Sequence, residues 1–407
     1  MGAMAFDDLP RMVLHDAAID HNIALMSAFC ERSGMLLAPH AKTHLSRELC
    51  DRQLAAGAWG LTAATTSQVR TLVGFGASRI LHANVLVDAA AIDFVAETFL
   101  GADSRLDYLC YVDSLAGLDL LERRLDEWGQ EERGLDERGP AKRLRVLVEV
   151  GFEGGRTGVR RAADARQLAH AVAASTRLEL AGVAGYEGLM PTGSGAHPDA
   201  ARGMLAGIRN LVTYLHEQQF FADVPVVTAG GSSYFDLVAE ELGPDAFDFD
   251  VLSVLRSGCY LTHDHGVYER TSPFGATPRL QPAGAFVPAF ELLASVLSAP
   301  EPGLVIAGFG RREVPTDDRL PVVLGSLDDG TGGADGADGA ALDTSGWVVT
   351  GVNDHHAYLR VPADTVVAPG TVLRFGISHP CGAFDRWRSI PLVDDAYAVV
   401  GQVSPAL

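Results

Sequence analysis

The feature that most constrains the fold is a regular alternation of short apolar runs with amphipathic segments between about Ile19 and Asp250. The amphipathic segments, such as residues 46–57, 162–175 and 201–218, have the apolar spacing of helices. Strand, helix and strand in alternation predict βαβ units and a parallel sheet. Eight apolar runs fit this scheme, at residues 35–39, 59–65, 79–87, 108–114, 145–152, 180–188, 224–232 and 249–258. Eight such strands favour a closed (β/α)8 barrel of the TIM type, with a doubly wound sheet as the alternative.

The pattern changes after about His265, where prolines become frequent and helical periodicity fades. Strand-like pieces follow at residues 289–299, 303–309, 347–354, 356–361, 371–377 and 397–403. We therefore predict two domains, a barrel over residues 16–265 and a β-rich domain over residues 266–407 that also takes in residues 1–15. The charged segment 120–143 predicts a solvated helix and loop, and the Gly/Ala/Asp-rich segment 326–346 predicts a mobile surface loop.

Amino-acid composition limits where the protein is expected to be located and what it is expected to bind. No run approaches the roughly 18–20 apolar residues that a membrane-spanning helix needs, and the first residues form neither a basic nor an apolar stretch. The five cysteines are scattered and odd in number, which predicts a reducing, cytoplasmic environment. The net charge of −20 disfavours nucleic acid and anionic membranes as partners. A small-molecule ligand is the better prediction.

The first chemical feature is Lys42 in the segment MLLAPHAKTH. This segment is predicted to continue as a strand up to Lys42, which would place the amine at the mouth of the barrel, where active sites of this architecture lie. A buried lysine has a depressed pKa, so its neutral amine can form a Schiff base with an aldehyde.

The second feature is a pair of glycine- and hydroxyl-rich turns that follow the seventh and eighth predicted strands. They are residues 228–233 (TAGGSS) and residues 256–260 (RSGCY). Glycine lets backbone N–H groups close on an anion, and barrels commonly bind phosphate after these two strands. The two turns together predict a phosphate site.

The third feature is the pair His379 and Cys381, whose spacing in an extended chain directs both side chains to one side. Imidazole and thiolate favour zinc among the common ions. Two ligands are too few for a closed structural site and suit a catalytic metal completed by water and a substrate oxygen. His355 and His356, on a β-like stretch ahead of this pair, either supply a general base or are solvated.

Taken together, these motifs resemble the D-serine dehydratase and D-threonine aldolase group of fold-type III, alanine racemase-like enzymes that use pyridoxal 5'-phosphate (PLP). The closest likeness is to bacterial proteins described as D-serine or amino acid deaminases. The motifs, in chain order, are PHAKTH (39–44), GGRTG (154–158), GYEG (185–188), TAGGS (228–232), LRSGCYLTHD (255–264) and SHPCGAFD (378–385).

The resemblance implies roles for individual residues. Lys42 would bind the cofactor and remove the Cα proton, Tyr186 would line the cofactor ring, and Arg156 would lie near its phenolic oxygen. A divalent metal would bind to His379 and Cys381, and the chain would form a homodimer. The cofactor phosphate would be held by Thr228, Gly230, Gly231, Ser257, Gly258 and Cys259.

The resemblance leaves the reaction open. A metal can help a β-hydroxyl leave, which gives a 2-oxo acid and ammonia, or it can orient that hydroxyl for cleavage to glycine and an aldehyde. Within the group, the cysteine of the H-x-C pair is more typical of dehydratases, so Cys381 favours a D-serine/D-threonine dehydratase over a D-threonine aldolase. An amino acid racemase and a non-catalytic PLP-binding protein are further alternatives. The substrate side chain stays open, and manganese and magnesium stay alternatives to zinc.

Overall fold

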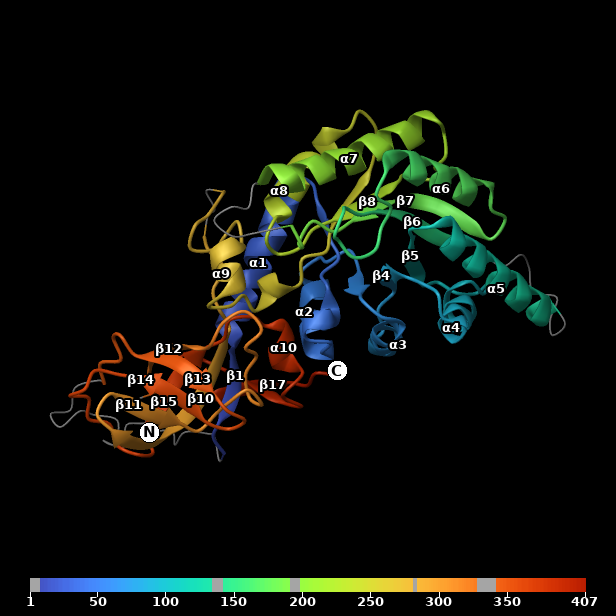
Figure 1. The fold of residues 1–407 in the computed structure, drawn as a ribbon. Coiled ribbons are helices and arrows are strands. Elements are labelled where there is room, and N and C mark those ends of the chain that lie inside the picture. Colours follow the sequence, from blue (N-terminus) through green and yellow to red (C-terminus); the bar gives the residue numbers. More distant parts are fainter. Residues whose placement is uncertain (1–7, 134–141, 191–197, 281–283, 328–341) are drawn as a thin grey trace. The chain divides into compact units, whose positions relative to one another are not determined.

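The computed structural model describes residues 8–133, 142–190, 198–280, 284–327 and 342–407 (Figure 1). The chain forms two compact units. Unit 1 comprises Met1–Met26, Thr43–Asp51 and Cys259–Leu407, and unit 2 comprises Ser27–Lys42 and Arg52–Gly258. The domain limits predicted from the sequence stay a prediction.

Unit 2 contains the predicted barrel, with eight parallel strands at the eight predicted positions. The strands are β2 (Leu36–Leu37), β3 (Leu61–Ala63), β4 (Arg79–Val85), β5 (Asp107–Val112), β6 (Leu144–Val150), β7 (Leu178–Gly185), β8 (Val226–Ala229) and β9 (Leu252–Leu255). They pair in the order β2-β9-β8-β7-β6-β5-β4-β3. The two ends of this sheet meet, because a parallel bridge joins His40 to Thr62 and the Trp59 amide donates to the Leu37 carbonyl.

Helices alternate with these strands and lie around the outer side of the curved sheet (Figure 1). They are α2 (Arg47–Ala55), α3 (Thr66–Phe75), α4 (Ala89–Phe99), α5 (Leu115–Arg133), α6 (Ala162–Ala174), α7 (Pro198–Glu217) and α8 (Phe235–Leu242). Local sequence fixes several of their ends: Thr65 and Asp88 accept N-cap bonds, and Gly76 ends α3 in a left-handed conformation. The charged segment predicted as helix and loop is helical up to Arg133, and residues 134–141 lie outside the described part.

Inward-facing side chains of the strands form the barrel core. Aliphatic residues dominate this cluster, and Tyr111 is its one aromatic member among the buried residues described. Close packing of these side chains leaves the barrel a filled core rather than a pore, so ligands are expected at its ends. The buried members are Ala38, Leu81, Leu109, Tyr111, Leu147, Ala181, Ala184, Val226 and Val254.

Unit 1 contains a mostly antiparallel nine-stranded sheet, as expected for the β-rich domain. Its strands are β1 (Arg11–His15), β10 (Phe290–Glu301), β11 (Leu304–Ala307), β12 (Val322–Ser326), β13 (Val348–Val352), β14 (Ala357–Arg360), β15 (Val372–Gly376), β16 (Ile390–Val393) and β17 (Val399–Val403). The opening strand β1 pairs antiparallel with β10. The other α-helices described are α1 (Asp16–Ser33), α9 (Val267–Thr271) and α10 (Cys381–Phe384), and the 3-10 helices are Ala41–Thr43, Pro244–Ala246 and Cys259–Leu261.

Two strands of this sheet were not predicted. Strand β16 contains Pro391, which normally argues against a strand, yet it pairs with β1 and β17. Strand β12 is short and leads directly into the Gly/Ala/Asp-rich segment, of which residues 328–341 lie outside the described part. No helix among the described residues is long and apolar enough to cross a membrane.

Candidate functional site

The structure corrects the local conformation predicted around Lys42. Strand β2 ends at Leu37, and Lys42 lies in a one-turn 3-10 helix, Ala41–Thr43, rather than on the strand. Pro39 has no N–H with which to extend the strand ladder, and an isolated bridge from His40 to Thr62 follows before the 3-10 turn. Lys42 nevertheless follows the carboxyl end of β2, and its side chain is half-buried.

Lys42 has one competitor as a Schiff-base lysine, because the 407-residue sequence contains a single other lysine, Lys142. Lys142 precedes β6 and so lies at the amino end of that strand, where its amine donates to the carbonyl of Ser104. Active sites of barrel enzymes lie at the carboxyl ends of the strands. The position after the carboxyl end of a barrel strand therefore favours Lys42 over Lys142 as the Schiff-base lysine.

Positive charges gather around His40 at the carboxyl ends of the unit 2 strands. Burial and the charges of Lys42 and Arg256 hold the pKa of His40 well below its ordinary value. Arg156 contributes in the same direction. Arg256 is itself buried and donates to the Thr228 hydroxyl over 3.1 Å. The sequence prediction included Arg256 in the second phosphate turn, residues 256–260, but gave it no individual role.

Tyr186 packs tightly against two glycines at the ends of β7 and β8. A Cβ atom on Gly188 would come within 2.4 Å of the Tyr186 hydroxyl, and one on Gly231 within 3.1 Å of its ring. The guanidinium carbon of Arg156 lies 4.7 Å from the centre of the Tyr186 ring. The structure thus brings together two residues that the sequence prediction placed beside the cofactor ring.

The glycine turn after β8 holds a buried carboxylate. The N–H groups of Gly230 and Gly231 donate to the two oxygens of Glu187, over 3.0 and 2.8 Å. Gly230 adopts a φ of +109°, a conformation that favours glycine. Burial raises the pKa of the Glu187 carboxyl, although these N–H groups act in the opposite direction. Two amides predicted to bind the cofactor phosphate are therefore bonded to Glu187 in this structure.

The second turn approaches His40 closely. A Cβ atom on Gly258 would lie 2.5 Å from the His40 carbonyl oxygen, so only glycine fits there. The Ser257 hydroxyl donates to the carbonyl of Gly231 over 3.1 Å, which ties the two predicted phosphate turns together. Glycine backbone, hydroxyls and the buried Arg256 form a donor set that suits a phosphate.

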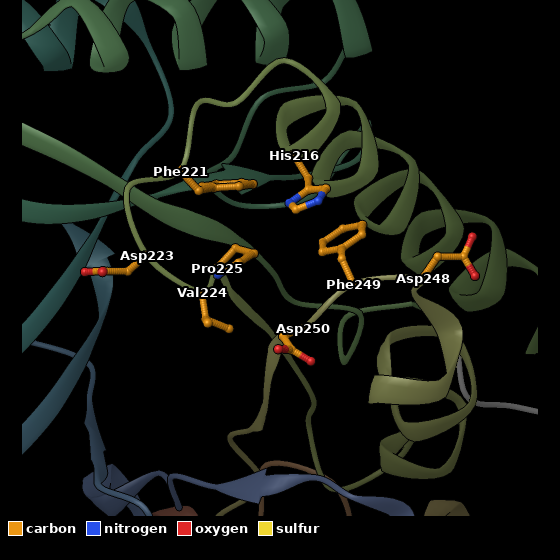
Figure 2. Close-up of a pocket in the computed structure, with 8 residues that line it drawn as sticks. All are labelled: His216, Phe221, Asp223, Val224, Pro225, Asp248, Phe249 and Asp250. Carbon is orange, nitrogen blue, oxygen red and sulfur yellow. The ribbon is translucent and has the colours of Figure 1, made fainter.

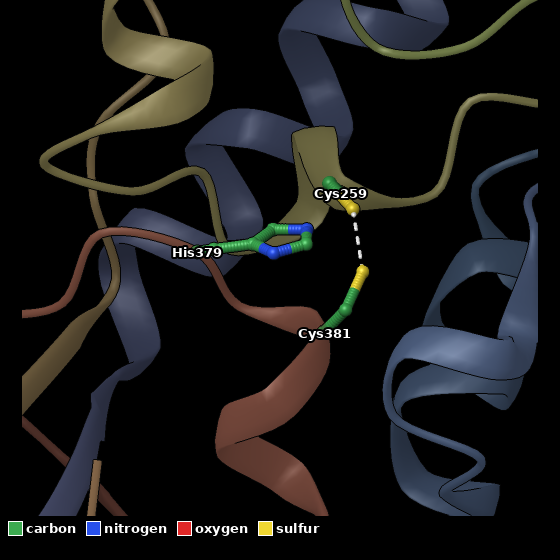
Figure 3. Close-up of side chains that lie close together, drawn as sticks. All are labelled: Cys259, His379 and Cys381. Atoms are coloured by element: carbon green, nitrogen blue, oxygen red, sulfur yellow. Dashed lines mark hydrogen bonds between the residues drawn. The ribbon is translucent and has the colours of Figure 1, made fainter. Parts of the chain in front are cut away.

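Unit 1 holds a compact cluster of metal-ligating side chains. Figure 3 shows the His379 ring and the thiols of Cys259 and Cys381 directed toward one another. One ligand atom from each lies within 4.8 Å of the others, and the two sulfurs are 3.4 Å apart. His379 and Cys381 come together, although Pro380 between them is helical rather than extended as predicted, and Cys259, which was assigned to the phosphate, lies with them.

Two further side chains contact this cluster. The Thr43 hydroxyl lies 3.5 Å from the Cys259 sulfur and 3.6 Å from that of Cys381. Nδ1 of His379 lies 2.5 Å from a carboxylate oxygen of Asp317. Burial lowers the pKa of His379, but its hydrogen bonds to Cys259 and Asp317 outweigh burial and raise that pKa to about 9. Sequence gave no signal for Asp317, because it lies 62 residues from His379.

Comparison with known proteins shows which proteins this chain resembles. The family model described as "Putative serine dehydratase domain" matches residues 289–393. A D-threonine aldolase from Arthrobacter sp. is 26% identical over 395 residues, which cover 95% of this chain and 89% of that protein. These similarities support the fold-type III, alanine racemase-like group of PLP enzymes that the sequence resembles.

Solved structures agree with this group in fold. D-threonine aldolase from Filomicrobium marinum superposes with a TM-score of 0.77 at 21% identity, over 98% of this chain and 95% of the other. D-threo-3-hydroxyaspartate dehydratase from Delftia sp. HT23 gives a TM-score of 0.71 at 20% identity, over 100% and 99% of the two chains. A metal-free form of a variant of that dehydratase has also been solved. The barrel with a β-rich C-terminal domain is thus the alanine racemase-like fold that the sequence predicted.

One cavity lies away from the residues of the candidate site. Figure 2 shows a cavity of about 530 Å³ lined by His216 stacked on Phe249 and by the carboxylates of Asp223, Asp248 and Asp250. These residues precede β8 and β9, whereas Thr228, Gly230 and Ser257 follow those strands. The cavity therefore lies at the amino ends of the strands.

His356, the predicted general base, is exposed on the hairpin between β13 and β14. It lines a cavity of about 510 Å³ with Arg311, Asn353, Asp354 and His355. His355 is bonded to Glu313 over 2.8 Å. A catalytic role for His356 stays a prediction.

Proposed function

We propose that this protein is a PLP- and divalent-metal-dependent lyase that acts on β-hydroxy D-amino acids. We further propose that its reaction is the dehydration of D-serine or D-threonine to a 2-oxo acid and ammonia. The names of the relatives support the substrate class: an aldolase for D-threonine and a dehydratase for D-threo-3-hydroxyaspartate. The predicted homodimer and cytoplasmic location stay predictions.

Residues at the strand ends of unit 2 fit the cofactor. When bound, PLP supplies an electron sink that weakens the bonds at the substrate Cα. Lys42 would attach it and exchange the Cα proton. Ser257, Gly258 and the buried Arg256 would hold its phosphate, with Tyr186 beside its ring. The further predicted phosphate residues, Thr228, Gly230, Gly231 and Cys259, would shape the two turns.

The observation that carries the proposal is the metal cluster of unit 1. A racemase gains nothing evident from a metal, whereas the loss or cleavage of a β-hydroxyl group is assisted by a Lewis acid. His379 and Cys381 would hold this metal and leave positions for water and the substrate hydroxyl. Thr43, whose hydroxyl touches both thiols, directly follows Lys42 in the chain.

A D-threonine aldolase is the second candidate. The Arthrobacter relative that matches 95% of this chain is named as one, and so is the Filomicrobium protein. Dehydration remains the first proposal because of the thiolate at position 381, which is more typical of dehydratases in this group.

Product analysis tests these candidates. Purified protein loaded with PLP and Zn²⁺ is incubated with D-threonine, and 2-oxobutanoate, ammonia, glycine and acetaldehyde are followed together. We expect 2-oxobutanoate and ammonia in equal amounts. Glycine and acetaldehyde would instead establish the aldolase, and L-configured amino acid alone would establish a racemase. PLP absorbance without turnover of D-serine, D-threonine or 3-hydroxyaspartate would contradict an enzymatic function.

A further inference from the structure

We propose that Cys259 is a third protein ligand of the metal, so that the site is a Cys2His site with a single open position. This inference rests on the proposed metal dependence and extends it, because the sequence pattern gave only His379 and Cys381. It assigns Asp317 as the residue that orients His379. It also selects zinc from the ions that the sequence left open.

The distances support coordination by both thiols. In a tetrahedral zinc site with Zn–S bonds of about 2.3 Å, two thiolates lie about 3.8 Å apart. The sulfurs of Cys259 and Cys381 are 3.4 Å apart, so a movement of a few tenths of an ångström gives that geometry. The ligand atom of His379 lies within 4.8 Å of both sulfurs. No other group of three metal-ligating residues of this kind occurs in the described part of the chain.

The other three cysteines of the chain do not form a comparable pair. Cys30, Cys50 and Cys110 are free and buried, and no described thiol contact joins any of them to another cysteine. They pack as small apolar side chains in the core. Cys259 and Cys381 instead come from segments 122 residues apart and meet beside an imidazole.

A neighbouring carboxylate orients the His379 ring for metal binding. Its Nδ1 faces the Asp317 carboxylate at 2.5 Å, which assigns the proton to Nδ1 and leaves Nε2 as the ligand atom. Asp317 lies in the connection between β11 and β12, so it is a positioning residue rather than a ligand. A carboxylate bonded to a ligating histidine fixes the ring and raises its basicity.

A third protein ligand has chemical consequences. Two thiolates neutralise the charge of a zinc dication, and three protein ligands leave one tetrahedral position, where one substrate oxygen can bind but a chelating pair cannot. Thiolates also disfavour Mn²⁺ and Mg²⁺, which prefer oxygen ligands. We therefore expect Zn²⁺ and Co²⁺, but not Mg²⁺, to bind tightly at this site.

The test replaces zinc by Co²⁺ in the full-length protein, because the sulfur-to-cobalt charge-transfer absorption reports the number of thiolate ligands. We expect Cys259→Ser and Cys381→Ser each to lose about half of this absorption per bound cobalt, relative to the unchanged protein. Cys30→Ser, which alters a buried cysteine outside the cluster, should keep it in full. Unfolding curves of all variants confirm that they are folded.

The outcomes separate this inference from the proposed function. If Cys259→Ser keeps the full absorption and Cys381→Ser loses all of it, the metal has one thiolate ligand, and the inference is wrong while the proposed function stands. A disulfide between the two cysteines in protein purified under reducing conditions would also overturn it. If the unchanged protein binds neither Zn²⁺ nor Co²⁺, both the inference and the metal-dependent function fail.

Discussion

The predicted cofactor region of unit 2 and the metal cluster of unit 1 are built in different ways. At the strand ends of unit 2, polar groups satisfy one another: Glu187 accepts two glycine amides, and Arg256 donates to Thr228. In unit 1, three ligand atoms converge within 4.8 Å, and two of them belong to thiols, which are weak hydrogen-bond partners. The first arrangement holds the turns by hydrogen bonds, whereas the second concentrates ligands that a soft cation satisfies best.

The difference also concerns how each region is assembled. Residues of the cofactor region follow consecutive parallel strands, whose carboxyl ends meet at one edge by the rules of the fold. The metal cluster takes one residue each from a turn, a connecting segment and the start of a helix, so no strand order brings them together. We therefore expect a substitution in the cofactor region to leave metal binding unchanged, and a substitution in the metal cluster to leave PLP binding unchanged.

The largest effect is expected from Lys42→Ala. Without the amine, the cofactor cannot be attached and the Cα proton has no acceptor, so turnover should fall by at least about 10³-fold. PLP absorbance should be lost, while binding of Zn²⁺, measured by competition with a chelating dye, should stay unchanged. Lys142→Ala is the matched control, because it removes the one other lysine of the chain. Retained PLP absorbance in Lys42→Ala would refute the assignment of Lys42.

A smaller effect is expected from Asp317→Asn, which weakens the bond that orients His379. Loss of such a partner typically lowers metal affinity by about 10–100-fold. Competition for Zn²⁺ measures this change, and PLP affinity should not move. Asp318→Asn serves as the control, since Asp318 pairs with Arg270 rather than with a ligand. Equal zinc affinity in both variants would show that Asp317 does not position His379.

The smallest effect is expected from Glu187→Gln. An amide offers its oxygen to one glycine N–H and turns its own NH2 toward the other, so one buried hydrogen bond is lost at a cost of about 1–3 kcal/mol. Urea unfolding should show this loss, and PLP should bind more weakly because the turn is less ordered. Glu153→Gln, at an exposed position of the same unit, is the control. Unchanged unfolding would mean that Glu187 does not hold the turn.

Sequence reasoning located the features that follow from local pattern. The eight barrel strands could be located because each is an apolar run bounded by a helical segment, and the pair His379 and Cys381 could be found because its members are two residues apart. It failed at β16, where Pro391 hid a strand that tertiary pairing stabilises. It also placed Lys42 on a strand, although Pro39 ends the ladder before that residue.

The sequence by itself determined the fold class, the lysine after the first barrel strand and two side chains of the candidate metal cluster. These depend on periodicity and short-range spacing, which a linear chain displays directly. Only the tertiary structure decided that Cys259 joins Cys381, that Asp317 faces His379 and that Glu187 occupies the glycine amides. Each of these contacts joins residues at least 43 positions apart in the chain. Contacts over such separations depend on how whole strands and loops pack, which local sequence patterns do not show.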